Sequence, residues 1–180
     1  MPVQTPICDF GKKALPFELK STENKVISLN DIKGENGTLI MFICNHCPYV
    51  KAVTMEIVED CNELKKIGIN TVAICSNDFV NYPDDSFENM IKFSNDNEFN
   101  FPYLQDETQE IAKAYDAVCT PDFFGYNKDL GLQYRGRLRE LKNFVPVKDG
   151  ESDLLKAMKQ IAETGKGPEM QIPSAGCSIK

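Results

Sequence analysis

Basic residues are scarce in this sequence compared with acidic ones. Its 180 residues include 20 Lys and Arg against 27 Asp and Glu, which gives a formal net charge of −7. Because contacts with the phosphates of nucleic acids require clustered Lys and Arg, this balance argues against a nucleic-acid partner. The nearest approach to a basic patch is YRGRLRE, where the alternate spacing of Arg135, Arg137 and Arg139 predicts one solvent-exposed face of a strand.

Long apolar runs are also missing. No stretch approaches the roughly 20 apolar residues that a membrane-spanning helix needs, and the first residues, MPVQTPICDFGKK, lack the apolar core of a signal peptide. We therefore expect a cytoplasmic protein with no membrane partner, in a compartment that keeps thiols reduced. The 7 cysteines are odd in number and scattered, which argues against a structural disulfide framework. Any disulfide is expected to be transient.

Hydrophobic patterning predicts an α/β domain with a central mixed sheet and helices on both faces. The runs TLIMFI, at 38–43, and INTVAICS, at 69–76, have the continuous apolar character of strands buried on both faces. An apolar stripe between them predicts a helix that ends near Gly68, so the two strands form a parallel crossover. The other predicted elements are an N-terminal hairpin from PFELKS and KVISLN, an extended FPYLQD, a hairpin within 122–138, and helices at 87–97, in ETQEIAKAYDA and in SDLLKAMKQIAETG.

The segment FICNHCPYVK holds the most informative motif of the chain. Cys44 and Cys47 lie three residues apart around the only histidine, His46, at the end of a predicted buried strand and the start of a predicted helix. A helix N-terminus offers unpaired N–H groups and a partial positive charge, both of which stabilise a thiolate. In such settings thiol pKa values fall from about 8.5 to between about 3.5 and 7.5. The motif therefore predicts a redox dithiol, with His46 as a cation that favours the thiolate.

Three other interpretations of the cysteine pair remain open. A tetrahedral zinc site needs about four ligands. The motif supplies two, and Cys119 and Cys177 are single cysteines, so we expect no bound metal. Two inert, buried thiols are the second alternative, and that is our interpretation of Cys8, Cys61 and Cys75. The third is a redox fold retained as a non-catalytic binding module.

Four segments together resemble a known group of proteins. FICNHCPYVK, AICSNDFVNYPDDSFENM, CTPDFFGYN and PSAGCSIK are similar, in order, to the peroxiredoxin-like branch of the thioredoxin superfamily, which is grouped with alkyl hydroperoxide reductase and thiol-specific antioxidant proteins. The resemblance implies a single thioredoxin-like domain over residues 1–164, with the N-terminal hairpin as an extension and residues 165–180 as a C-terminal tail. It also implies that Thr120 and Pro121 form the cis-proline loop that contacts an extended substrate.

The sequence departs from peroxiredoxins at two positions that activate peroxide. Where the family carries Thr or Ser three residues before the peroxidatic cysteine, matched here by Cys47, this chain has Cys44. Where the family carries an arginine, this chain has the Thr120–Pro121 loop. These differences favour a thiol–disulfide oxidoreductase without a cofactor, in which an exposed Cys44 attacks a protein or small-molecule disulfide and Cys47 resolves the mixed disulfide. A thiol of thioredoxin or glutathione type is the expected electron donor.

Two alternative functions follow from the same residues. In a thiol peroxidase, Cys47 would reduce a hydroperoxide and become a sulfenic acid, with Cys44, Cys119 or Cys177 as candidate resolving thiols. In a non-catalytic binding module, the groove beside the motif would hold partners without any redox step.

Overall fold

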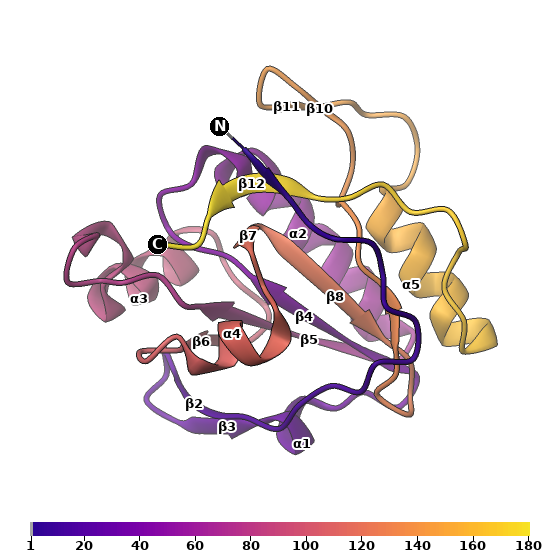
Figure 1. Ribbon diagram of the computed structural model, residues 1–180, viewed down its shortest axis with the longest axis horizontal. Helices are drawn as coiled ribbons and strands as arrows, with labels where there is room; N and C mark the ends of the chain where they lie inside the picture. Colours follow the sequence, from indigo (N-terminus) through magenta and orange to yellow (C-terminus); the bar gives the residue numbers. More distant parts are fainter. Residues whose placement is uncertain (1) are drawn as a thin grey trace.

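The computed structural model describes residues 2–180 and is built around a seven-stranded mixed sheet (Figure 1). The strand order is β3-β2-β6-β5-β4-β8-β9. The central pairs β4–β5 and β5–β6 are parallel, and the other pairs are antiparallel. This confirms the predicted mixed sheet and the thioredoxin-like fold class. The strands are β2 (Glu18–Ser21), β3 (Val26–Ser28), β4 (Gly37–Phe42), β5 (Ile69–Cys75), β6 (Tyr103–Gln105), β8 (Asp122–Tyr126) and β9 (Leu132–Tyr134).

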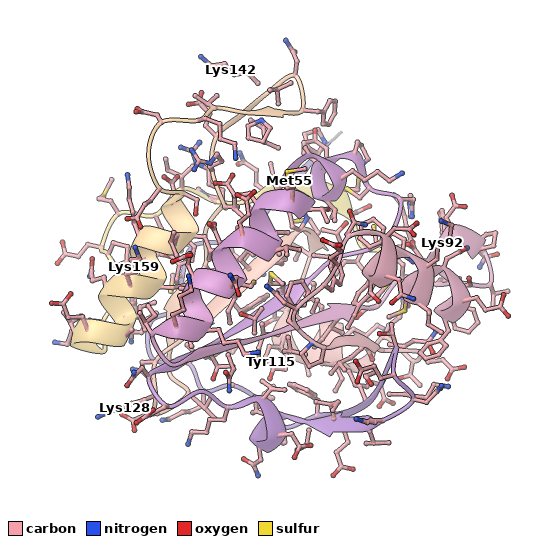
Figure 2. The ribbon with its side chains drawn as sticks, turned by 180° about the vertical axis from the view of Figure 1, so that it is seen from behind. Met55, Lys92, Tyr115, Lys128, Lys142 and Lys159 are labelled. Carbon is pink, nitrogen blue, oxygen red and sulfur yellow. The ribbon has the colours of Figure 1, made fainter. Side chains whose placement is uncertain are left out.

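Helices cover both faces of this sheet. On one face, α2 (Pro48–Lys66) and α5 (Asp153–Thr164) lie side by side, with Met55 and Lys159 pointing outward (Figure 2), and α3 (Phe87–Asp96) lies at the edge. On the other face lie α1 (Leu29–Ile32) and α4 (Glu110–Tyr115) (Figure 1). Every residue of β4 is buried because its alternate side chains enter the two cores formed by these layers.

The ends predicted for α3 and α5 match the structure, whereas the helix predicted over ETQEIAKAYDA is shorter and covers only Glu110–Tyr115. The side chain of Ser86 accepts a hydrogen bond from the Asn89 N–H at the start of α3, and Ser152 does the same for Leu155 at the start of α5. Gly165 ends α5 in the left-handed conformation, with φ of 77°. α2 differs, because its N-cap is Cys47, whose side chain makes no capping hydrogen bond.

The expectation of three solvent-exposed arginines on one strand face is wrong. β9 ends at Tyr134, so alternation does not continue through the arginines. Arg135 and Arg139 are only 6% and 7% exposed. Each meets a buried carboxylate, with Nη2 of Arg135 3.0 Å from Asp122 and Nη2 of Arg139 2.6 Å from Glu56. Arg137 is paired with Asp153 at 2.7 Å, so all three arginines serve ion pairs.

A second, three-stranded sheet has the order β1-β12-β7. It joins one strand near each end of the chain, β1 and β12, to β7, which lies next to the cis-proline. β12 lies between β1 and β7 and pairs antiparallel with both. The sequence did not predict β12, because its four residues, Ala-Gly-Cys-Ser, are all small and show too little alternation of apolar and polar side chains. The strands of this second sheet are β1 (Val3–Gln4), β7 (Cys119–Thr120) and β12 (Ala175–Ser178). A separate hairpin consists of β10 (Leu141–Lys142) and β11 (Val145–Pro146).

Within residues 2–180, no helix is long and apolar enough to cross a membrane.

Candidate active site

The cysteine motif lies where β4 passes into α2. β4 ends at Phe42, Cys44 follows in the connecting loop, and Cys47 is the N-cap of α2. The carbonyl of Cys47 accepts hydrogen bonds from the N–H groups of Val50 and Lys51, at 3.1 and 2.9 Å. Pro48 occupies the first helical position, where the missing N–H costs no helical hydrogen bond. This places the Cys47 sulfur at the positive end of the α2 dipole.

Both sulfurs face Thr120 of β7. Sγ of Cys44 lies 3.5 Å from Oγ1 of Thr120, and Sγ of Cys47 lies 3.3 Å from the Thr120 carbonyl oxygen, to which a thiol would donate. The Thr120–Pro121 peptide bond is cis, which confirms the loop conformation implied by the resemblance. The structure thus brings together the four predicted residues that form the dithiol and its facing loop.

The prediction that Cys44 is exposed is wrong. Cys44 is 1% exposed and Cys47 is 0% exposed, so neither sulfur is open to solvent. Cys47 is covered by β12, whose Cys177 contacts it. Cys177 was a candidate resolving thiol, but its tail was predicted without secondary structure, so a strand over Cys47 was not expected.

Hydrogen bonding divides the two thiols into a donor and an acceptor. A hydrogen bond with Cys44 lowers the pKa of Cys47 from 9.0 to about 4, against an opposing effect of burial, and contacts with Cys177 and Thr120 add to the lowering. The same hydrogen bond, together with burial and the charge of Asp85, raises the pKa of Cys44. Cys44 is therefore the thiol that donates, and Cys47 carries the thiolate.

Asp85 organises the loop that carries the motif. One oxygen of this carboxylate accepts from the Asn45 N–H at 2.8 Å, and the other accepts from Asn77 Nδ2 at 2.8 Å. Tyr103 adds a 2.8 Å hydrogen bond from its hydroxyl to Oδ1 of Asn45. All four residues are buried. Sequence reasoning missed them because their spacing forms no motif, and only the Asn-Asp-rich segment after β5 hinted at a polar site.

The sequence suggested His46 as a cation beside the dithiol, but in the structure its ring lies against a carboxylate. Its Nδ1 lies 2.7 Å from Oδ2 of Asp85, although without the geometry of a directed hydrogen bond. The carboxylate side chain has no exposed surface, and its negative charge opposes any effect of a protonated His46 on the thiolate. The ring also stacks parallel to Tyr82, with centroids 6.4 Å apart. The influence of His46 on the dithiol stays a prediction.

Three groups at the site have the right chemistry to hold a metal ion. The ligand atoms of Cys44, His46 and Asp85 all lie within 4.8 Å of one another. However, both oxygens of Asp85 already accept hydrogen bonds from buried amides, and Cys44 donates to Cys47. A metal would have to displace these contacts, so the arrangement fits a dithiol better.

The two further cysteines named as resolving thiols have different surroundings. Cys119 is fully buried, and its sulfur donates to the Pro121 carbonyl at 3.6 Å, while burial raises its pKa. Cys177 is half-buried and contacts Cys47. Burial, followed by the hydrogen bond with Cys47, raises the pKa of Cys177 to about 11. Of the two, only Cys177 lowers the pKa of Cys47.

A dithiol at the start of a helix, facing a cis-proline loop beside a mixed sheet, defines a thioredoxin-fold redox protein. The sequence profile described as the AhpC/TSA family matches residues 10–140, and the chain belongs to this family. Family and fold together confirm the resemblance to peroxiredoxin-like members of the thioredoxin superfamily.

Several solved structures share this fold. An uncharacterized conserved protein from Geobacillus kaustophilus is 46% identical, with a TM-score of 0.93 over 100% of this chain and 96% of that chain. A hypothetical protein from Sinorhizobium meliloti 1021 is 30% identical, with a TM-score of 0.91 over 100% and 98%. The thioredoxin domain of a thiol-disulfide oxidoreductase from Bacteroides vulgatus is 18% identical, with a TM-score of 0.59 over 74% and 89%. No curated protein matches the chain.

Proposed function

We propose that the protein is a thiol–disulfide oxidoreductase whose working pair is Cys44 and Cys47. The observation that carries this proposal is the placement of both sulfurs at the N-terminus of α2, each within 3.5 Å of Thr120 in the cis-proline loop. One member is stabilised as a thiolate and the other is held as a thiol, which is the state that a dithiol needs before exchange. The facing cis-proline loop supports the same chemistry.

The hydrogen-bond pattern favours Cys47, rather than Cys44, as the attacking sulfur. The Cys47 thiolate attacks one sulfur of a substrate disulfide, forms a mixed disulfide and releases the other half as a thiolate. Cys44 then attacks Cys47, its proton passes to the departing sulfur, and a Cys44–Cys47 disulfide remains. Both sulfurs are buried, so an incoming disulfide reaches Cys47 when β12 moves away from β7. A thiol donor of thioredoxin or glutathione type would restore the dithiol.

A thiol peroxidase is the second candidate, because Cys47 is the thiolate of the pair and matches the peroxidatic cysteine. The arginines argue against it. The chain has only three, and each is held by a carboxylate, namely Arg135 by Asp122, Arg137 by Asp153 and Arg139 by Glu56. A peroxide at Cys47 would therefore lack the cation that stabilises the departing oxygen in peroxiredoxins.

The test compares two oxidants on the fully reduced protein. Bis(2-hydroxyethyl) disulfide and hydrogen peroxide are added separately, thiol loss is followed with time, and the modified cysteines are mapped by mass. We expect the disulfide to produce Cys44–Cys47 and peroxide to react at the rate of a free low-molecular-weight thiol. The Cys47→Ser variant should lose the reaction with the disulfide. Fast reaction with peroxide, with sulfenic acid first at Cys47, would replace this proposal by the peroxidase.

A further inference from the structure

The backbone edge beside the cis-proline loop is already occupied by the chain itself. β12 pairs with β7 in antiparallel register, with Cys177 opposite Thr120 and Ser178 opposite Cys119 (Figure 1). A strand edge of this kind is the surface on which an extended peptide could add. The approach is very close, because a Cβ atom on Gly176 would lie 2.0 Å from the Thr120 carbonyl oxygen. The C-terminal strand therefore takes the position of a bound peptide.

Contacts on both sides hold this strand in place. Before β12, the Ser174 hydroxyl donates to the Pro121 carbonyl at 2.7 Å, and the Thr5 N–H donates to the Ser174 carbonyl at 3.0 Å. After β12, the Lys180 N–H donates to Oδ1 of Asn77 at 2.9 Å. Asn77 also binds Asp85 through its amide nitrogen, so the segment after β12 is linked to the loop that carries the dithiol.

This register directs Cys177 toward the dithiol. Residues directly opposite each other in an antiparallel pair project from the same side of the sheet. Thr120 projects toward Cys44, at 3.5 Å, so the side chain of Cys177 projects that way as well. Cys177 packs against the core cluster that contains Cys47, and the two thiols shift each other's pKa. Cys47 thus lies between two thiols, and Cys177 is the only half-buried member of the three.

We propose that Cys177 is a third redox cysteine, which connects the buried dithiol to thiols in solvent through a Cys47–Cys177 disulfide that joins the start of α2 to β12. This inference rests on the proposed function, because it starts from the Cys44–Cys47 disulfide that substrate reduction leaves behind. It assigns Cys177 to recycling, which the buried pair could not undergo directly while β12 stays in place.

The exchange balances in three steps. Cys177 gives up its proton and attacks Cys47, Cys44 leaves and takes up a proton, and the disulfide now joins Cys47 to Cys177. A monothiol from solvent then attacks the Cys177 sulfur and releases the Cys47 thiolate, which is the better leaving group because its pKa is lowered. A second monothiol attacks the mixed disulfide on Cys177 and restores its thiol. Overall, two external thiols become one disulfide and the dithiol is reduced.

A first experiment asks whether the Cys47–Cys177 disulfide forms. The Cys44→Ser variant, which leaves these two thiols at the site, is oxidised with one equivalent of diamide and mapped by mass without reduction. We expect Cys47–Cys177 to be the main product. A disulfide from Cys47 to Cys119, or a Cys47 that stays unpaired, would overturn the proposal.

A second experiment measures recycling in the otherwise intact protein. Wild type, Cys177→Ser and Cys8→Ser are oxidised to the Cys44–Cys47 disulfide, and 2-mercaptoethanol is added. Samples quenched in acid report the remaining disulfide. We expect Cys177→Ser to be reduced about tenfold more slowly, because it loses the intramolecular thiol. Cys8→Ser, which removes another half-buried cysteine, should match wild type. Equal or faster reduction of Cys177→Ser would overturn the proposal.

The two proposals fail in different ways. If wild type forms a Cys44–Cys47 disulfide but Cys177→Ser is recycled at the wild-type rate, only the role of Cys177 is wrong. If diamide produces no Cys44–Cys47 disulfide in wild type, the dithiol function fails, and the recycling that begins from it fails as well.

Discussion

Among single residues, Asp85 is the carboxylate on which the conformation of the cysteine motif depends. Replacing Asp85 by Ala leaves the Asn45 N–H and the Asn77 amide without their acceptor inside the protein. We expect the free energy of unfolding to fall by about 2–4 kcal/mol, the usual penalty for buried donors left unpaired. Urea denaturation measures this. The neighbouring Asp84→Ala, which removes an exposed side chain, should change stability by less than about 0.5 kcal/mol. Equal effects would contradict the role of Asp85.

The thiolate on Cys47 is the second feature that belongs to the residue scale. Because its pKa is lowered to about 4, reduced wild type should keep one thiolate at neutral pH and lose it only near pH 4. Absorbance at 240 nm, titrated from pH 8 to pH 3, reports this ionisation. Cys47→Ser should remove the acidic transition, and Cys8→Ser should leave it unchanged. A transition that persists in Cys47→Ser would assign the thiolate to another cysteine.

The sequence identifies the two reacting residues but not their surroundings. Cys44, Cys47 and their place between strand and helix follow from local spacing and hydrophobic runs. Asp85 and Asn77 approach the motif only through the loop that follows β5, and nothing local marks a carboxylate for burial. The relative pKa values of the two thiols depend first on the hydrogen bond between them, and then on burial and, for Cys44, on the charge of Asp85. The spacing of the motif reveals none of these, so the sequence pointed to Cys44 as the nucleophile while the lowered pKa favours Cys47.

Among the elements, β12 has the clearest functional consequence. A methyl group at position 176 would meet the Thr120 carbonyl at 2.0 Å, so Gly176→Ala should push β12 away from β7. We expect iodoacetamide to modify Cys47 about tenfold faster in this variant, because local opening of the strand becomes easier. Gly131→Ala is the control, since its added methyl would have ordinary contacts from 3.5 Å. Unchanged alkylation in Gly176→Ala would show that β12 does not shield the dithiol.

A buried ion pair joins α2 to the segment between β9 and β10. Arg139 donates to both oxygens of Glu56, and both side chains are almost fully buried. Arg139→Met leaves the Glu56 carboxylate buried, with Lys148 as its remaining partner at 3.4 Å, so we expect a loss of about 3 kcal/mol in unfolding free energy.

The matched variant for this pair is Arg137→Met, which breaks a more exposed pair with Asp153. It should cost less than about 1 kcal/mol in the same urea titration. If the two variants lost the same unfolding free energy, the buried pair would contribute no more to stability than the exposed one.

Elements with a strong periodic pattern were predictable, and those that depend on distant partners were not. The apolar runs of β4 and β5 and the capping residues of α3 and α5 can be recognised from the local sequence alone. β1, β7 and β12 have two to four residues each and exist because residues from distant parts of the chain meet. The prediction that the arginines form one strand face was wrong for a related reason, since their carboxylate partners come from other elements.

At the scale of the whole molecule, the redox state should set how stability depends on pH. A thiol whose folded pKa is about 4 and whose unfolded pKa is 9.0 adds stability that is complete above pH 9 and is lost as the pH falls through 4. The disulfide form lacks this group. Between pH 5 and pH 8, the unfolding free energy of the reduced form should therefore rise relative to the oxidised form, by up to about 1 kcal/mol per pH unit.

Urea denaturation of both forms at several pH values measures this difference. Cys47→Ser, which has no such thiolate and cannot form the Cys44–Cys47 disulfide, should show no comparable rise over the same interval. A difference between reduced and oxidised wild type that is independent of pH would contradict the lowered pKa.

The order of elements along the chain adds a consequence for biosynthesis. β12 follows every other element, yet it completes the cover over cysteines that are made much earlier. A chain emerging from the ribosome folds from its N-terminus onward. Until β12 has been synthesised and has paired with β7, the cysteine motif lacks the strand that covers Cys47 in the folded protein. The newborn protein is therefore more open to oxidants, and to mixed-disulfide formation with other disulfides, than the finished one.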